Sequence, residues 1–176
     1  TTNSWVGGNP KEDVTTAKIE RGSIFPYVKN VAVYRCPSDN SKVVGRKTIR
    51  RTRSYSMSAY LHGDEVGVNP RVKRRLSELI NPSSDRTFVF IEEHEQSVWN
   101  GSFHVVPRER FSLASGSWTS TPADRHMQGC NLSFADGHIE HWRWFAPKRG
   151  NLDSIQVTGS NELKDLRRLQ DCIPRP

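Results

Sequence analysis

The chain has 176 residues, of which 34% are hydrophobic, and it carries a net charge of +7. This length suits one domain with a real core, and no apolar run approaches the roughly 18 residues that a membrane span needs. The three cysteines form no CxxC pair, which argues against a zinc knuckle or a thioredoxin-like site. The basic balance fits either an anionic partner or simply a basic soluble surface.

The first part of the chain is polar and irregular. Residues 1–22 carry turn signals at Gly7-Gly8 and Asn9-Pro10, so we expect an extended N-terminal arm there and one globular domain over residues 23–176. A basic run over residues 42–53 is interpreted either as a solvated loop or as a binding patch. Its arginines include Arg50, Arg51 and Arg53.

Further along, residues 54–60 alternate with period two and residues 86–91 form an apolar run, so both segments are expected to be strands. A short helix is expected over residues 72–80 and an amphipathic C-terminal helix over residues 161–169. With scattered Gly and Pro, the pattern favours a loop-rich fold with short strands over a helical bundle.

Residues 126–144 contain the strongest local signal. Two runs flank Asp136-Gly137, a pair that favours a two-residue hairpin turn. Such a turn would place Phe134 opposite Ile139, with Leu132, Phe134 and Ile139 on the core face. His138, Glu140 and Trp142 would then lie on the other face.

The hairpin also gathers metal-ligating residue types. Imidazole and carboxylate ligands suit zinc or another transition metal, and the alternative is that Asp136 serves the turn alone. The candidate zinc ligands are His126, Asp136, His138 and Glu140. No nucleophile elbow and no HExxH motif is present, so we expect no catalysis, with a metal-dependent hydrolase as the lesser alternative.

A second candidate surface combines aromatic and basic residues. Aromatic rings beside cations stack on bases or sugars, which would make the domain a binding module for an acidic polysaccharide or DNA. The alternative is that the tryptophans pack against protein. The residues concerned are Trp142, Arg143 and Trp144, together with the three arginines of the basic run.

His126, nine further residues and Asp136-Gly137 make up an H-X9-DG signature. With it come the blocks Tyr34-Arg35-Cys36-Pro37-Ser38-Asp39, Arg53-Ser54-Tyr55-Ser56-Met57, Phe90-Ile91-Glu92-Glu93 and Pro122-Ala123-Asp124-Arg125-His126. In this combination the chain resembles the prepilin-processing-associated H-X9-DG family of type II secretion and type IV pilin-like proteins. The similarity spans most of residues 21–149.

The resemblance implies an α+β, pilin-like domain with an antiparallel sheet, long loops and short helices. Such a domain acts beyond the inner membrane as a structural or assembly subunit of a filament, with other pilin or pseudopilin subunits as partners. It also implies a hydrophobic N-terminal helix that anchors the subunit before assembly. That helix is absent from this chain, and we expect it before Thr1.

Two further expectations follow from the resemblance. Calcium binding in related major pseudopilins makes Glu92 and Glu93, at a strand end, candidate calcium ligands. The extracytoplasmic setting permits a disulfide, for which Cys36 with Cys172 is the first pairing considered, although the sequence does not fix the connectivity.

Overall fold

The computed structural model describes residues 4–61, 69–112, 115–150 and 154–176. Its centre is a five-stranded sheet in the order β3-β1-β2-β5-β6, which is antiparallel except between β1 and β3. The strands are β1 (Tyr55–Ser58), β2 (Phe88–Glu92), β3 (Ser102–Phe103), β5 (Gly129–Phe134) and β6 (Ile139–Arg143). The fold is therefore α+β, as the sequence predicts.

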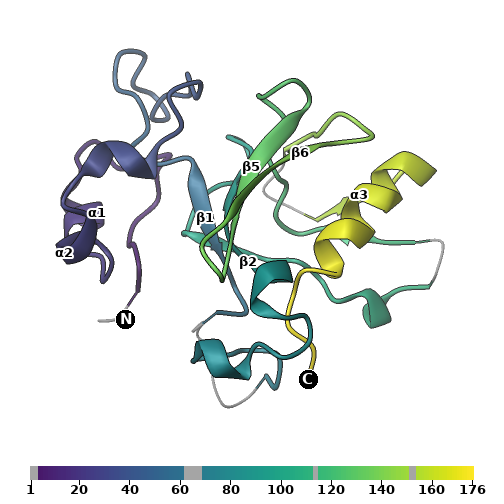
Figure 1. The fold of residues 1–176 in the computed structure, drawn as a ribbon. Helices are drawn as coiled ribbons and strands as arrows, with labels where there is room; N and C mark the ends of the chain where they lie inside the picture. Colours follow the sequence, from purple (N-terminus) through teal and green to yellow (C-terminus); the bar gives the residue numbers. More distant parts are fainter. Residues whose placement is uncertain (1–3, 62–68, 113–114, 151–153) are drawn as a thin grey trace.

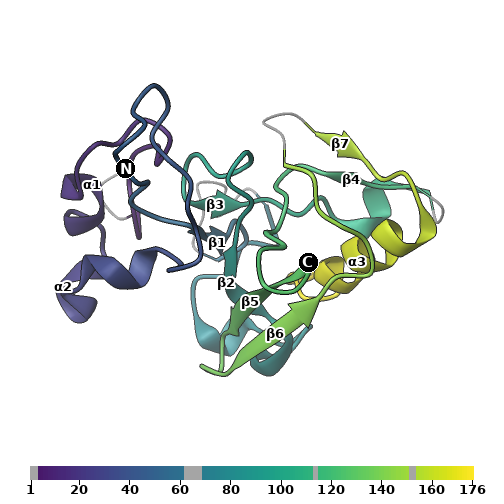
Figure 2. The ribbon, with the colours of Figure 1, turned by 90° about the horizontal axis from the view of Figure 1, so that it is seen from above.

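The sheet lies between two groups of elements (Figure 1). On one side are α3 (Ser160–Gln170) and a two-stranded ribbon of β4 (Ser117–Trp118) and β7 (Ile155–Gln156). On the other side are α1 (Ala17–Glu20), α2 (Phe25–Val28) and the 3-10 helix η1 (Val31–Tyr34), as the view from above shows (Figure 2). The remaining short 3-10 helices are η2 (Leu76–Glu78), η3 (Ser84–Arg86) and η4 (Arg108–Arg110).

The main core lies between the sheet and α3. Leu166 and Leu169 of α3 are fully buried, because their three-residue spacing puts both on one helical face. The predicted helix over residues 161–169 is thus confirmed with almost the same bounds. At its start, Thr158 donates through its backbone N–H and its hydroxyl to Glu162 Oε2, at 2.9 and 3.2 Å. These bonds fasten the first turn of α3 to the preceding loop.

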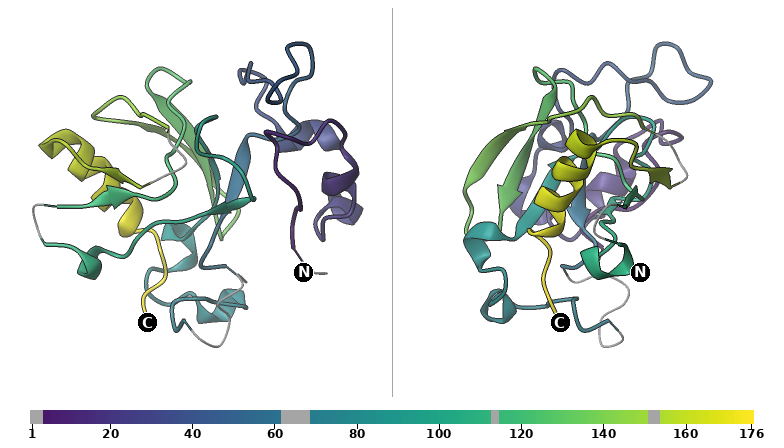
Figure 3. Two further views of the ribbon diagram at one scale, coloured as in Figure 1. Left: turned by 180° about the vertical axis from the view of Figure 1, so that it is seen from behind. Right: turned by 90° about the vertical axis from the view of Figure 1, so that its right-hand side faces the viewer.

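The N-terminal segment, residues 4–54, covers the side of the sheet opposite α3. Residues 4–22 pack within it and do not form the expected extended arm. Trp5, Val6 and Ile19 are buried, and with Tyr34 they form a second hydrophobic cluster. Polar composition suggested an arm, but a few apolar side chains suffice to hold the segment against the sheet. Seen from behind, it packs beside the sheet on the side away from α3 (Figure 3).

The hairpin of β5 and β6 forms where it was predicted, but its register differs by one residue. Ser133 pairs with Ile139, and the Phe134 N–H donates to the His138 carbonyl at 2.9 Å. The connection is a three-residue loop in which Gly137 has a φ of 97°, rather than a two-residue turn.

This shift changes the face of every β6 side chain, because side chains alternate along a strand. Ile139, expected in the core, is 71% exposed, whereas Trp142 is buried. Leu132 and Phe134 lie in the core as predicted.

Among the described residues, no helix is long and apolar enough to cross a membrane.

Candidate metal centre

Three potential metal ligands from distant parts of the chain meet beside the sheet. Cys36 lies two residues after η1, Glu92 is the last residue of β2, and His126 lies in the turn that leads into β5. Their ligand atoms all lie within 4.8 Å of one another. The cysteine and the histidine are 90 positions apart in the sequence, so only the tertiary fold brings the three ligands together.

The contacts within this cluster converge on one nitrogen. His126 Nε2 lies 3.2 Å from the Sγ of Cys36 and 3.0 Å from Oε1 of Glu92. A nucleophilic relay would use the two ring nitrogens separately, one toward the thiol and one toward the carboxylate. Here both partners face Nε2, so the cluster has the arrangement of ligands around a common point rather than that of a relay.

Burial differs across the cluster. Glu92 is completely buried and Cys36 is 2% exposed, while the His126 side chain is 26% exposed. The cluster is thus closed on the side of the sheet and reaches solvent at the imidazole.

Glu92 and His126 are held by backbone groups around them. The second carboxylate oxygen of Glu92 accepts the N–H of Asn131 at 3.0 Å. The His126 N–H donates to the Gly129 carbonyl at 3.1 Å, across a turn in which Met127 and Gln128 both have left-handed φ values of 53° and 59°. Two consecutive non-glycine residues in this region are uncommon, and here they form the turn that holds the imidazole.

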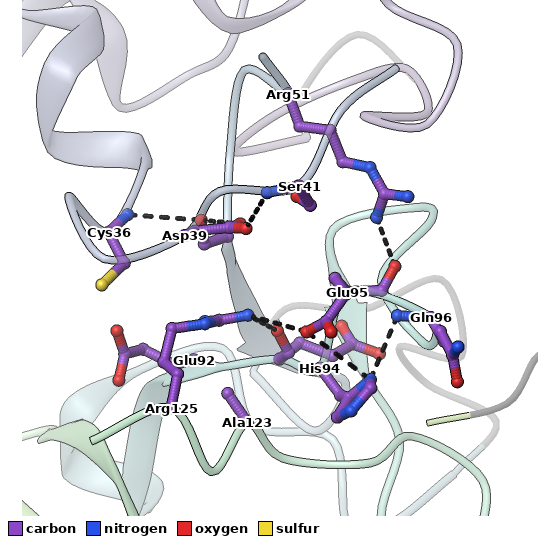
Figure 4. A network of polar contacts seen from close by, with 12 residues as sticks. Cys36, Asp39, Ser41, Arg51, Glu92, His94, Glu95, Gln96, Ala123 and Arg125 are labelled. Carbon is purple, nitrogen blue, oxygen red and sulfur yellow. Dashed lines mark hydrogen bonds and ion pairs between the residues drawn. The ribbon is translucent and has the colours of Figure 1, made fainter. Parts of the chain in front are cut away.

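A wider polar network joins the cysteine loop to the sheet. Asp39 Oδ2 accepts the Ser54 hydroxyl at 2.5 Å, and the Cys36 N–H donates to the same hydroxyl at 3.3 Å. In Figure 4 the Cys36 and Glu92 side chains lie on the same side of this network, beside the Arg125 side chain. Arg125 donates to the Glu93 carbonyl at 3.3 Å and to Glu95 at 3.4 Å.

The electrostatics of the cluster reflect this burial. Burial, followed by the hydrogen bond and charge of Glu92, raises the pKa of the Cys36 thiol. Burial and the charge of Glu92 likewise raise the pKa of Tyr55, which follows Ser54 at the start of β1. Hydrogen bonds from Ser54 and Ser41 hold the pKa of Asp39 below its ordinary value, although burial acts in the opposite direction.

The zinc ligands predicted from the hairpin do not form one group. His126 belongs to the cluster with the cysteine, at the end of the hairpin away from the turn. Asp136, His138 and Glu140 lie together at the turn end, with His138 Nδ1 2.6 Å from Asp136 Oδ1 and Nε2 3.3 Å from Glu140 Oε1. All three are at least one-third exposed, and each imidazole nitrogen faces a carboxylate.

The predicted calcium pair is also separated. Glu92 and Glu93 are consecutive at the end of β2, so their side chains point to opposite faces. Glu93 Oε1 accepts the Ser97 hydroxyl at 2.6 Å, and burial raises the pKa of Glu93 to about 7. Among the residues that the structure describes, these two carboxylates do not share a site.

Most of the predicted polymer-binding residues face inward. Arg51 is 9% exposed and Arg53 1%, and Arg53 donates to the carbonyls of Gly8 and Trp99 at 2.9 and 3.1 Å. Burial lowers the pKa of Arg53 to about 10. These guanidiniums bind backbone carbonyls of the same chain, while Arg50 is exposed.

The two tryptophans are core residues. Trp142 and Trp144 are 4% and 2% exposed, and Arg143 between them is exposed. The guanidinium of Arg168 in α3 lies 3.7 Å from the centre of the Trp142 ring. The tryptophans therefore pack within this chain, and they do not form an exposed stacking surface.

The structure contains three free, buried thiols, so the predicted disulfide does not form. Cys36 lies in the cluster with His126, whereas Cys172 belongs to the main core near α3. Cys36 was not predicted as a potential metal ligand, because only the fold brings it to His126. The available signal was the presence of both residues in blocks of the H-X9-DG pattern.

No family model, no curated protein and no solved structure matches this chain.

Proposed function

We propose that the protein is a structural or assembly subunit of a filament of the type II secretion or type IV pilus class. The globular domain would act beyond the inner membrane, and its partners would be other pilin or pseudopilin subunits. In this proposal the α+β domain is a pilin-like one.

One observation carries the proposal. The blocks that resemble the H-X9-DG family are far apart in sequence, yet Cys36, Ser54, Glu92 and His126 from four of them meet in one network. Ser54 binds the cysteine loop, and the cysteine in turn contacts the histidine. These four residues come from the blocks that carry the resemblance, so their convergence supports reading the blocks together.

The surface suggests where a neighbouring subunit would bind. A groove of about 390 Å³ lies between the N-terminal segment and the sheet, lined mostly by apolar side chains that include Phe90 and Ile139. Ile139 is 71% exposed and Val33, also in the lining, is 54% exposed. Exposed apolar surface of this kind marks protein interfaces.

The polymer-binding alternative has less support, because Arg51, Arg53 and both hairpin tryptophans are buried. The metal-dependent hydrolase is also less favoured. Its candidate centre among the described residues gathers Cys36, Glu92 and His126, and no further imidazole or carboxylate belongs to that group to act as a general base.

The test is photo-crosslinking in cells that produce the full-length protein. A photoreactive phenylalanine analogue at Ile139 is expected to give adducts with filament subunits in the surface fraction released by shearing. The same analogue at Val44, which is 68% exposed and does not line the groove, is the matched control. Equal adducts from both positions, or absence of the protein from filaments, would contradict the proposal.

A further inference from the structure

We propose that Cys36, Glu92 and His126 bind one zinc ion, which fastens the N-terminal segment to the central sheet. The proposal concerns a different property from filament assembly and does not depend on it.

The donor set points to zinc. Zinc binds cysteine sulfur, histidine nitrogen and carboxylate oxygen, whereas calcium and magnesium prefer ligand sets made of oxygen. Bond lengths of about 2.0–2.3 Å in a tetrahedral zinc site place neighbouring ligand atoms roughly 3.3–3.8 Å apart. The contacts of 3.2 and 3.0 Å at His126 Nε2 are only slightly shorter, so small side-chain movements would admit the ion.

The arrangement also meets the requirement that ligands be oriented by further contacts. Glu92 offers Oε1 to the cluster while its Oε2 is held by the N–H of Asn131. Such supporting bonds fix the direction of a ligand and strengthen metal binding. Because the His126 side chain is partly exposed, a water molecule would complete the fourth position.

The ion would add a bond between two parts of the molecule that a hydrophobic cluster already holds together. Cys36 belongs to the N-terminal segment, whereas Glu92 and His126 belong to the sheet and to the turn before β5. The hydrogen bond from Trp5 to the Gly101 carbonyl and the contact of the Trp5 ring with Phe90 link the same two parts. Metal binding would therefore stabilise the docked N-terminal segment, because an ion that binds only the folded arrangement favours it.

The first experiment uses metal-free protein titrated with Zn²⁺ and, as a spectroscopic probe, with Co²⁺. We expect one equivalent to bind and the cobalt form to show a thiolate-to-metal charge-transfer band. Cys36→Ser should abolish that band, and His126→Gln should weaken zinc binding at least tenfold. Cys172→Ala and His138→Gln, which remove a thiol and an imidazole outside the cluster, should change neither result.

A second measurement covers variants that fail to fold. X-ray absorption of the unmodified zinc-loaded protein should show one sulfur and otherwise nitrogen and oxygen ligands. Zinc should also slow proteolytic cleavage within residues 4–54. Absence of stoichiometric binding, a zinc shell without sulfur, or a cobalt thiolate band that persists in folded Cys36→Ser would each overturn the proposal.

Discussion

The ammonium group of Lys148 lies 2.6 Å from Oδ2 of Asp165, and both side chains are completely buried. Asp165 also accepts the N–H groups of Phe145 and Ala146, at 2.9 and 3.1 Å. Burial lowers the pKa of Lys148, and its hydrogen bond to Asp165 opposes that shift. The pair joins α3 to the segment that follows β6, beneath the ring of Trp144.

Removing one charge of this pair should be costly. Asp165→Asn keeps the size of the side chain but leaves the Lys148 charge buried without its counterion. We expect it to lower the free energy of unfolding by about 3–5 kcal/mol, measured by urea denaturation. The double variant Asp165→Asn with Lys148→Met should lose less than the sum of the two single changes, because no unpaired charge remains.

The control is the ion pair of Arg149 with Glu162, another residue of α3, whose Oε2 lies 3.8 Å from the Arg149 guanidinium. The Arg149 side chain is 61% exposed, so Arg149→Met should change the free energy of unfolding by less than about 1 kcal/mol. Similar losses from Asp165→Asn and Arg149→Met would show that the buried pair contributes no more than a surface pair.

At the hairpin turn, two carboxylates favour the charged form of His138. The hydrogen bond that the His138 ring donates to Asp136, followed by the one it donates to Glu140, raises the pKa of His138 above its ordinary value. Since the folded-state pKa is the higher one, the stabilisation is fully present below the ordinary pKa of histidine. It is lost as the pH rises through the folded-state value.

Asp136→Asn should therefore lower the pKa of His138, as followed by NMR titration of the imidazole C–H signals. In the native protein Asp136 Oδ1 accepts the backbone N–H of His138 at 3.1 Å. The asparagine oxygen can still accept this backbone N–H, so the turn should be kept. Glu140→Gln should give a smaller decrease, because its contact with the imidazole is longer. An unchanged His138 pKa in Asp136→Asn would rule out the carboxylate as the cause.

Local patterns predicted several elements of this fold, but not their register or long-range contacts. The helix expected over residues 72–80 was wrong, because that stretch holds only the 3-10 helix η2 (Leu76–Glu78). Period-two and helical spacing located β2, the β5–β6 hairpin and α3, because those signals lie within one segment. The hairpin register depends on loop length, and Asp136-Gly137 fits both a two-residue turn and the observed three-residue loop with Gly137 at positive φ. A register shift of one residue leaves Ile139 exposed to solvent and puts Trp142 in the core.

The candidate site was predicted only in part for the same reason. His126 and Glu92 were both identified as potential ligands, but each was grouped with residues near it in sequence. Their contact, and the contact with Cys36, crosses three separate segments. No local pattern encodes that meeting, and the family-like blocks showed only that the residues occur together.

Trp5 anchors the N-terminal segment to the sheet. Its indole N–H donates to the Gly101 carbonyl at 2.9 Å. Its ring stacks on that of Tyr34, with 5.7 Å between the ring centroids, and lies edge-on to Phe90, with 4.9 Å between the centroids. Trp5→Ala should cost about 3–5 kcal/mol in the free energy of unfolding, because it removes a large buried ring. Trp5→Phe keeps much of the ring but leaves the Gly101 carbonyl without that donor, so we expect a loss of about 1–3 kcal/mol.

The loss should be local to this part of the chain. Limited proteolysis with mass spectrometry should show that Trp5→Ala speeds cleavage within residues 4–54 more than within α3, because the N-terminal segment opens without unfolding the main core. Trp99→Ala is the matched control, since Trp99 is 56% exposed and its contact with Arg53 uses only the backbone carbonyl. If Trp99→Ala destabilised the protein as much as Trp5→Ala, burial of the Trp5 ring would not be what holds the segment to the sheet.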